Sequence, residues 1–228
     1  MAYVAITGAA RGIGFELARQ HLEAGDHVFA LVRNPAAADR LNALAAASGG
    51  LLTVHAMDVG DDASVKAGAA ATGNGHIDLL YNVAGVGGVM TPELDSVDWD
   101  AWDDVFNIMV KGPLRVLQAF LPRLDPGSKV INFSSQVGAS TWPYGGLYAY
   151  AAAKAALGRL MRSVATDLKP RGIIVGIIHP GYVKTDMGGP GAEITPEESA
   201  AGVRKVVAGW TLEQSGDFYK WNGEPHPW

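Results

Sequence analysis

Hydrophobic and polar positions follow a regular order along the chain, in which short apolar runs alternate with longer amphipathic segments. The apolar runs have the length of strands and cover Tyr3–Thr7, His27–Val32, Leu51–Ala56, Ile77–Val83, Val130–Ser134 and Ile173–Ile178. The other segments have helical periodicity and cover Gly12–Glu23, Ala36–Ala47, Asp61–Thr72, Trp99–Leu121, Tyr148–Leu168 and Pro196–Gly209. Strands that are apolar on both faces are typical of a parallel sheet with helices on both sides. The pattern predicts a doubly wound α/β fold, in which ligands bind beyond the carboxyl ends of the strands.

Length, charge and cysteine content narrow the choice of function. The 228 residues suit one domain, residues 1–228, because no linker or internal repeat is visible. A net charge of −5 without a basic stripe argues against a nucleic-acid partner. The absence of cysteine excludes disulfide and thiolate chemistry. The start lacks the features of a signal peptide, and no apolar run is long enough to span a bilayer. We therefore expect a cytoplasmic protein without a membrane partner.

The first strand is followed by a glycine-rich turn, Thr7-Gly8-Ala9-Ala10-Arg11-Gly12-Ile13-Gly14. Glycines at these positions let the backbone turn tightly and approach a pyrophosphate, and the start of the next helix offers free N–H groups to that anion. The spacing is G-x-x-x-G-x-G and not the commoner G-x-G-x-x-G. The alternative is a glycine-rich turn that binds no ligand. The position of this turn after the first strand favours a dinucleotide site.

Two arginines bear on the choice of dinucleotide. The second strand ends in "ALVRNP", so that Val32 stands where an acidic residue would bind the ribose of NAD, and Arg33 follows it. Arg11, inside the glycine turn, is the second guanidinium that can reach the same corner. Because arginine pairs well with a 2′-phosphate, NADP is favoured and NAD is the alternative. The alternative is that both arginines are ordinary surface charges in contact with water.

The stretch "LYAYAAAK", residues 147–154, contains a candidate catalytic pair. Residues four apart share a helix face, so Lys154 lies on the face of Tyr150 and not on that of Tyr148. A cation about 4 Å away is worth roughly 4 kcal/mol at an effective dielectric of about 20. We therefore expect Lys154 to lower the pKa of the Tyr150 phenol from near 10 and to make it a general acid or base. Ser134 and Ser135, at the end of the fifth strand, offer hydroxyls that can hold a substrate carbonyl oxygen.

Taken together, these motifs resemble the classical short-chain dehydrogenase/reductase family over almost its entire length. The family motifs are matched by Thr7–Gly14 (T-G-x-x-x-G-I-G), Asp58–Val59 (D-V), Asn82–Gly85 (N-N-A-G, with Val83 for the second Asn), Ser135, Tyr150 and Lys154 (Y-x-x-x-K), and Pro180, Gly181 and Thr185 (P-G-x-x-x-T). The final stretch "GDFYKWNGEPHPW" is most similar to the branch related to the bacterial C-factor protein. The resemblance implies a single-domain Rossmann-type fold.

The resemblance also implies hydride transfer between nicotinamide and a carbon that bears oxygen. Tyr150 would move the proton, Lys154 would lower the phenol pKa and hold the nicotinamide ribose, and Ser135 would orient the substrate oxygen. Cofactor contacts are implied at Gly8, Arg11, Gly12, Ile13, Gly14, Arg33, Asp58, Val59, Asn82, Ala84, Gly85, Tyr150, Lys154, Pro180, Gly181, Val183 and Thr185. No metal is implied, and the family's pairing of long helices implies a homodimer or homotetramer. The alternative is a non-catalytic nucleotide-binding signalling protein on the same scaffold.

One position departs from the family. Its catalytic asparagine, in the helix before the fifth strand, falls here on Met109 in "FNIMVKGP", while Asn107 faces elsewhere on the helix. In the family this asparagine helps to hold a water that relays protons from the lysine. A thioether is a weak acceptor without a donor. The favoured interpretation is that another water path serves the relay. A slow or specialised enzyme and a non-catalytic protein are the alternatives, and Met109 can also be ordinary core filling.

Aromatic residues after Ser135 suggest the kind of substrate. Trp142, Tyr144 and Tyr148 follow this serine, and Met187 follows the P-G-x-x-x-T motif. Apolar walls with few polar groups are typical of a small-molecule pocket, so we expect a hydrophobic, and in particular an aromatic, alcohol or ketone. Packing in the core or at a subunit contact is the alternative for these rings and for Trp210, Trp221 and Trp228. The stretch from Gly188 to Gly191 is interpreted as a loop, and as a candidate lid.

Overall fold

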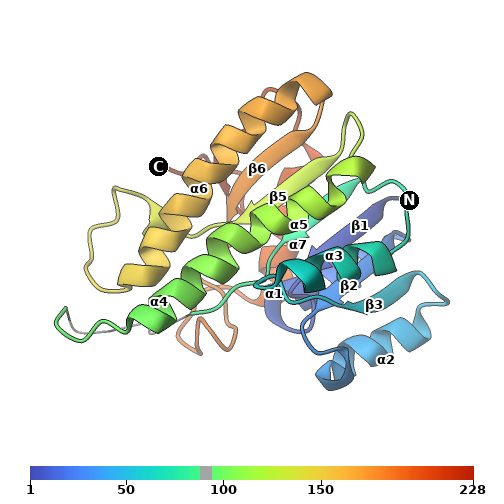
Figure 1. The fold of residues 1–228 in the computed structure, drawn as a ribbon, viewed down its shortest axis with the longest axis horizontal. Coiled ribbons are helices and arrows are strands. Elements are labelled where there is room, and N and C mark those ends of the chain that lie inside the picture. The colour runs from blue at the N-terminus through green and yellow to red at the C-terminus, as the bar shows by residue number, and fades with distance from the viewer. Residues whose placement is uncertain (88–93) are drawn as a thin grey trace.

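The computed structural model describes residues 1–87 and 94–228, and within these residues the chain forms one seven-stranded sheet (Figure 1). The strands are β1 (Tyr3–Thr7), β2 (His27–Val32), β3 (Leu52–Ala56), β4 (Leu79–Asn82), β5 (Lys129–Phe133), β6 (Ile174–His179) and β7 (Phe218–Lys220). Their order is β3-β2-β1-β4-β5-β6-β7, and every neighbouring pair is parallel. The first strand, β1, is interior and pairs with β2 from Tyr3 opposite His27 and with β4 from Val4 opposite Leu79.

Helices cover both faces of this sheet and give it two hydrophobic cores. The helices are α1 (Gly12–Glu23), α2 (Asp39–Ala47), α3 (Asp62–Ala71), α4 (Trp99–Phe106), α5 (Gly112–Phe120), α6 (Tyr148–Leu168) and α7 (Pro196–Ala208). One core joins the sheet to α1, α2 and α7 through residues such as Leu17, Leu41 and Val203. The other joins it to α3, α5 and α6, which lie on the near face in Figure 1. The predicted doubly wound α/β fold is confirmed.

The long helix predicted over Trp99–Leu121 is interrupted. A π-helical turn, Asn107–Lys111, separates α4 from α5, and Gly112 donates its N–H to the Asn107 carbonyl oxygen, five residues back. Pro113 follows and has no N–H to give. The Ile108 carbonyl oxygen therefore receives no hydrogen bond from the residue four positions on, Gly112, or from the residue five positions on, Pro113. A turn of this kind is frequent at functional sites, and here it carries Met109 on its inner side, with 1 % of its surface exposed.

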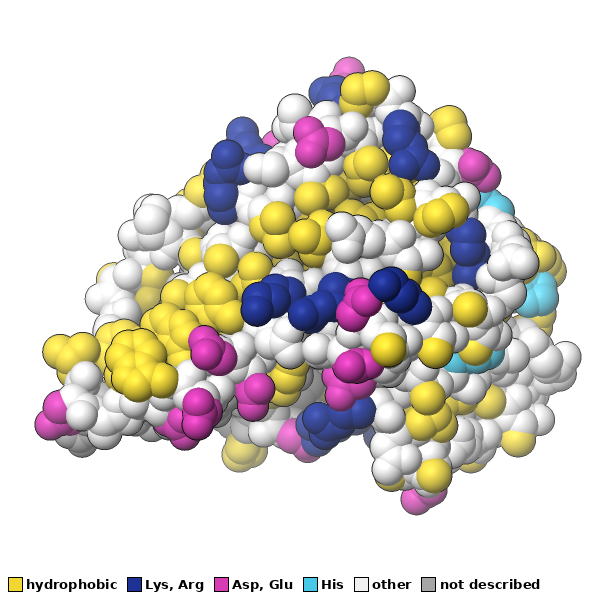
Figure 2. All heavy atoms as spheres, viewed as in Figure 1, with side chains coloured by type: hydrophobic (Ala, Val, Ile, Leu, Met, Phe, Trp, Pro, Cys, Tyr) yellow, Lys and Arg dark blue, Asp and Glu magenta, His cyan; other side chains and the backbone are white. Residues whose placement is uncertain are grey.

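The outer surface of α4, α5 and α6 carries apolar side chains, which gather over these helices in Figure 2. Trp99 is 68 % exposed, and Leu114, Leu160 and Val164 are partly buried against the core. This surface is where the resemblance expects a homodimer or homotetramer to form, and the oligomeric state stays a prediction. Among the described residues, no helix has the length and apolarity needed to cross a bilayer.

Candidate active site

In the glycine turn between β1 and α1, the backbone packs closely against neighbouring backbone atoms. Gly8 has φ +70°, and a Cβ atom there would lie 2.8 Å from the Ala84 Cα atom. A Cβ atom on Gly14 would lie 2.3 Å from the Gly8 carbonyl oxygen. The hydroxyl of Thr7 accepts hydrogen bonds from the N–H groups of Val83 and Ala84, at 3.1 and 3.2 Å. These contacts lock the turn against the end of β4 and leave it no room for larger residues.

The turn has the donors that a cofactor pyrophosphate needs. Helix α1 begins at Gly12, and its N-cap residue Arg11 makes no side-chain hydrogen bond to the helix N–H groups. Arg11 therefore does not cap the first N–H groups of this 12-residue helix, and the positive end of the helix dipole lies at the same place. Together with the glycine cradle, this arrangement fits the pyrophosphate of a dinucleotide.

The adenosine end of the expected site lies at the ends of β2 and β3. Arg33 is exposed directly after β2, and Asp58 is partly buried two residues after β3. The Asp58 carboxylate accepts from the Gly60 N–H at 2.9 Å, and Val59 packs against Gly112. Asn82 is different, because its side-chain amide donates to Asn132 Oδ1 at 2.9 Å inside the sheet. The structure therefore gives Asn82 a role in joining β4 to β5.

The P-G-x-x-x-T motif, for which the resemblance implies cofactor contacts, lies against the glycine turn. A Cβ atom on Gly12 would lie 3.2 Å from the Thr185 Cγ2 atom. Thr185 is held in place because its hydroxyl accepts from the Gly188 N–H at 3.1 Å. Pro180 is fixed by Ser199, whose hydroxyl donates to the Pro180 carbonyl oxygen at 2.6 Å. The loop after β6, which also contains Gly181 and the buried Val183, therefore lies against the start of α1.

Ser135, Tyr150 and Lys154 come together at the carboxyl end of β5. Ser135 is the N-cap of the short turn Gln136–Gly138, and its hydroxyl lies near enough to the Tyr150 phenol to lower its pKa. The Lys154 ammonium lies 5.5 Å from the centre of the Tyr150 ring. This turn is pressed onto α6, since a Cβ atom on Gly138 would lie 2.9 Å from the backbone of Lys154 and Ala155. The three predicted catalytic residues thus form one cluster.

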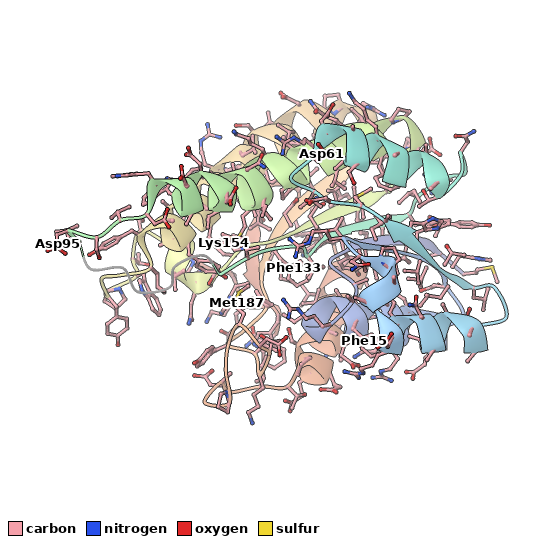
Figure 3. All side chains as sticks on the ribbon, turned by 60° about the horizontal axis from the view of Figure 1, so that its bottom comes forward. Phe15, Asp61, Asp95, Phe133, Lys154 and Met187 are labelled. Carbon is pink, nitrogen blue, oxygen red and sulfur yellow. The ribbon has the colours of Figure 1, made fainter. Side chains whose placement is uncertain are left out.

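The neighbouring serine has a different role. Ser134 is buried, and its hydroxyl donates to the Lys154 carbonyl oxygen at 3.0 Å. The Lys154 ammonium itself donates to the Phe133 carbonyl oxygen at 2.7 Å. In Figure 3 the labelled Lys154 and Phe133 lie close together at the centre of the molecule. Of the two adjacent hydroxyls, that of Ser135 influences the phenol, and that of Ser134 joins β5 to α6.

The electrostatics of the cluster differ from the expectation in one respect. Burial raises the pKa of the Tyr150 phenol, and the hydrogen bond from Ser135 lowers it by a smaller amount. Burial also lowers the pKa of Lys154 to about 8. The predicted lowering of the Tyr150 pKa by Lys154 is wrong for this arrangement, because the ammonium lies over the ring and donates to Phe133. The phenol is therefore the protonated partner at neutral pH.

Met109 fills the space beside this cluster. Its side chain forms a small cluster with Val105 and Ala153, against which Tyr150 packs, and its sulfur lies 3.6 Å from the position that a Cβ atom on Gly85 would take. Asn107 faces elsewhere, as predicted. Its amide nitrogen donates to the Gly60 carbonyl oxygen at 3.0 Å, and its amide oxygen accepts from Arg115 at 2.9 Å. This asparagine cannot replace the missing one at the cluster.

The residues expected to line a substrate pocket are partly accessible. Trp142 is partly buried and contacts Tyr144, with ring centres 5.1 Å apart, while Tyr144 is 70 % exposed. Tyr148 begins α6, and Met187 is 44 % exposed in the loop after β6. In Figure 3, Met187 lies on the loop below Lys154. Their contact with a substrate stays a prediction.

The three later tryptophans lie elsewhere. Trp210 is buried in the core against Gly176, and Trp221 packs against Gly181 and Gly202. Trp228 covers Gly158 on α6, and its main-chain oxygen accepts from the N–H and the hydroxyl of Ser140, at 2.9 and 2.7 Å. This contact pins the loop that follows Ser135. No local pattern predicts this contact, because 88 residues separate the two partners.

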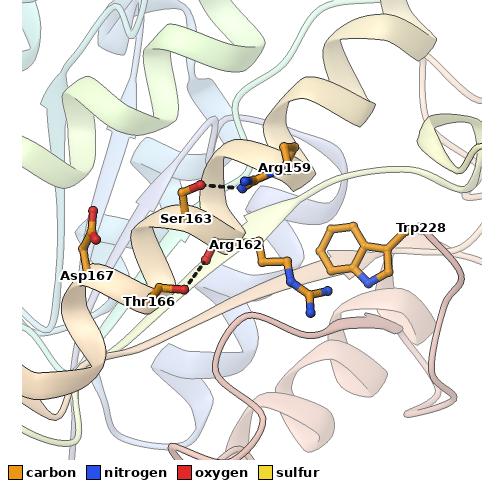
Figure 4. Close-up of a pocket in the computed structure, with 6 residues that line it drawn as sticks. All are labelled: Arg159, Arg162, Ser163, Thr166, Asp167 and Trp228. Carbon is orange, nitrogen blue, oxygen red and sulfur yellow. Dashed lines mark hydrogen bonds between the residues drawn. The ribbon is translucent and has the colours of Figure 1, made fainter.

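A shallow hollow on the outer face of α6 is separate from the catalytic cluster. It is lined by Arg159, Arg162, Ser163, Thr166, Asp167 and Trp228 (Figure 4). Arg162 lies over the Trp228 ring, 4.9 Å from its centre. Lys154 points to the opposite, buried side of the same helix. The hollow therefore adds nothing to the site at the sheet edge.

Comparison with known proteins agrees with this geometry. A family model described as short chain dehydrogenase matches residues 2–194. C-signal of Myxococcus xanthus is 41 % identical over 157 residues, which are 68 % of this chain and 94 % of that protein. The 1-hydroxy-2-glutathionyl-2-methyl-3-butene dehydrogenase of Rhodococcus sp. (strain AD45) is 33 % identical over 235 residues, which cover 100 % of both chains. The NADPH-bound carbonyl reductase from chicken fatty liver superposes with a TM-score of 0.91 at 33 % identity, covering 100 % of this chain and 99 % of that one.

Proposed function

Because the chain belongs to the short-chain dehydrogenase family, we propose that it is an NADP-dependent oxidoreductase that interconverts a small hydrophobic alcohol and its ketone or aldehyde. One observation carries the proposal. Ser135, Tyr150 and Lys154 form a cluster at the carboxyl end of β5, at the same edge as the glycine turn after β1. A dinucleotide laid along this edge of a doubly wound sheet brings its reactive ring to that cluster.

The residues present fit the cofactor. The glycine turn and the first N–H groups of α1 would hold the pyrophosphate, Arg33 and Arg11 a 2′-phosphate, Asp58 the adenine, and Thr185 the nicotinamide end. The carbonyl reductase from chicken fatty liver binds NADPH on the same fold, which supports NADP over NAD. When bound, the nicotinamide gives or takes a hydride at its C4 atom.

The protein's own residues handle the proton. In the reducing direction, the hydroxyls of Ser135 and Tyr150 would donate hydrogen bonds to the substrate carbonyl oxygen. As the carbonyl carbon receives the hydride, the oxygen takes the Tyr150 proton and the product is an alcohol. The phenolate left behind is stabilised by the Ser135 hydroxyl, which lowers the Tyr150 pKa, and it regains a proton from solvent. The raised pKa of Tyr150 keeps the phenol in its acid form at neutral pH, which suits reduction.

The substrate class follows from the groups around the cluster. Trp142 and Tyr148, together with Tyr144 and Met187, are partly buried or exposed and would offer apolar and aromatic surface to a substrate. The similar dehydrogenase from Rhodococcus sp. is named for an alcohol substrate, and the similar chicken protein is a carbonyl reductase. These names support alcohol and carbonyl chemistry.

The test is a turnover assay on the purified protein. NADPH and NADH are each supplied with aromatic and aliphatic ketones and aldehydes, and consumption of the reduced cofactor is followed. We expect NADPH-dependent reduction of at least one aromatic carbonyl, which the Tyr150→Phe variant does not catalyse. Failure of the wild-type protein to reduce any of these carbonyl compounds with either cofactor would overturn the proposal.

A second candidate is a non-catalytic nucleotide-binding signalling protein. The 41 % identity to C-signal and the presence of Met109 at the position of the family asparagine favour it. The two candidates separate at Tyr150. A biological effect of the protein that survives Tyr150→Phe supports signalling, whereas an effect lost together with turnover supports the enzyme.

A further inference from the structure

The guanidinium of Arg11 is paired with a carboxylate from a distant part of the chain. Arg11 Nη1 donates to Asp186 Oδ2 at 2.7 Å, and the two side chains are 78 % and 75 % exposed. Arg11 is the residue before α1, and Asp186 follows Thr185 in the loop after β6. The two residues are 175 positions apart in the sequence.

This ion pair spans the edge of the sheet where the cofactor would lie. β1 and β6 are separated in the sheet by β4 and β5, so the loop after β6 crosses the ends of both strands to reach the glycine turn. The contact between Thr185 and the Cβ position of Gly12 places the loop there independently. Arg11 is thus held toward the loop after β6, whereas Arg33 stands at the end of β2, on the other side of β1.

We propose that Asp186 is a specificity-determining residue, because it competes with the 2′-phosphate of NADP for Arg11 and thereby weakens the preference for NADP over NAD. The inference rests on the proposed function, because it concerns the same cofactor site. A 2′-phosphate carries a charge of about −1.5 to −2 at neutral pH and can pair with a guanidinium bidentately. It can therefore displace the singly charged carboxylate of Asp186 from Arg11. NAD has no such group and leaves the ion pair intact.

The solvent exposure of the Arg11–Asp186 ion pair determines how much Asp186 changes the affinity for NADP. Ion pairs between exposed side chains are weak, because water and salt screen them. Removing Asp186 as a competitor is therefore expected to tighten NADP binding by about two- to fivefold. The affinity for NAD is expected to stay the same, because NAD does not use Arg11. In wild type the competition thus reduces the preference for NADP, and the loss of Asp186 increases it.

The experiment is calorimetric titration of NADP and NAD into wild type, Asp186→Asn, Arg11→Gln and the double variant. Glu23→Gln is the matched control, because it removes one carboxylate from an exposed ion pair with Arg19 at the far end of α1. That end is about 18 Å from Arg11 at 1.5 Å per residue, which exceeds the screening length of about 8 Å at physiological salt. Binding is measured directly, so no turnover is needed.

We expect Asp186→Asn to lower the Kd for NADP while leaving that for NAD unchanged, and Glu23→Gln to change neither. In the Arg11→Gln background, Asp186→Asn is expected to have no effect on NADP, because the two changes act through one contact. Equal tightening of NADP and NAD, or an effect that persists without Arg11, would show a general field effect and overturn the inference. Unchanged NADP binding in Asp186→Asn overturns it as well. Binding of neither cofactor by wild type would instead overturn the proposed function itself.

Discussion

The ammonium of Lys154 is held by the Phe133 carbonyl oxygen, 2.7 Å away, at the last residue of β5. The hydrogen bond fixes the charged end of a helix side chain on the sheet, directly ahead of Ser134 and Ser135. Ser134 completes the link, because its hydroxyl donates back to the Lys154 carbonyl oxygen. The strand end and the helix therefore hold the lysine and the catalytic hydroxyl in one rigid unit.

Burial of Lys154 gives the stability of the protein a defined pH dependence. Its pKa is about 8 in the folded protein and near 10.4 in the unfolded chain. Between these values the unfolded chain binds more protons, so the free energy of unfolding rises with pH by up to about 3 kcal/mol. Urea unfolding of wild type and Lys154→Met across this range checks it. We expect the rise in wild type and a flatter curve in the variant.

The control for this measurement is Lys66→Met, which removes an exposed lysine of α3 that pairs with Asp62. It should leave the pH dependence as in wild type. A Lys154→Met variant whose stability rises with pH as steeply as that of wild type would contradict the assignment to Lys154.

Replacing the phenol of Tyr150 should remove the chemistry and leave the fold. Loss of a general acid typically costs about 10²- to 10⁴-fold in rate, so kcat of Tyr150→Phe should fall by at least the lower figure. The Kd for NADP should change little. The matched control is Tyr148→Phe on the same helix turn, which we expect to keep kcat within about threefold because Tyr148 is assigned no proton transfer. Steady-state kinetics and calorimetry of both variants test this, and equal losses would argue against the assignment.

Met109→Asn should keep activity but lower stability. The side chain is 1 % exposed among apolar neighbours, and a buried amide without full hydrogen bonding costs about 1–3 kcal/mol. Because the favoured relay does not use this side chain, turnover should remain within about tenfold of wild type. Met109→Leu is the control and should be nearly neutral, at less than about 1.5 kcal/mol. A wild type inactive on every substrate, beside an active asparagine variant, would contradict the retained relay.

Substitution of two glycines with similar backbone conformations distinguishes the cost of backbone strain from the cost of a steric clash. Gly8 and Gly25 have φ values of +70° and +80°, but a Cβ atom on Gly8 would meet Ala84 at 2.8 Å, whereas one on Gly25 would meet nothing within 4 Å. Each alanine substitution should cost about 1–2 kcal/mol from the left-handed backbone. Gly8→Ala should cost more and should also weaken NADP binding. Thermal unfolding and calorimetry of both variants test this. Equal losses of stability with intact NADP binding would show that the close packing of Gly8 against Ala84 is not needed to bind the cofactor.

Local pattern was sufficient to predict much of the fold. The bounds of β1, β2, α1 and α6 agree with the prediction, because each has a clear period and a glycine or polar boundary. The short strand β7 was missed, since three residues at a sheet edge have no recognisable period. The break between α4 and α5 was missed because Pro113 was not weighed against an otherwise continuous helical pattern.

The catalytic cluster could be predicted because its spacing is local. Tyr150 and Lys154 are one helix turn apart, and Ser135 follows a recognisable strand. The predicted direction of the Tyr150 pKa shift was wrong, because the position of the lysine ammonium depends on Phe133, which belongs to another element. The pairing of Arg11 with Asp186 joins residues that are far apart in sequence, and no local pattern specifies such a contact.

The position of β1 between β2 and β4 has a consequence for biosynthesis. Thr7 finds one of its hydrogen-bond partners, Val83, 76 residues later. At about 5–20 residues per second this part of the chain takes roughly 4–15 s to emerge from a ribosome. Until then the first strand has one unpaired edge, and the glycine turn lacks the wall that Ala84 provides. The nascent chain therefore passes through an interval in which chaperone binding competes with misassembly, and slowing translation should lengthen it.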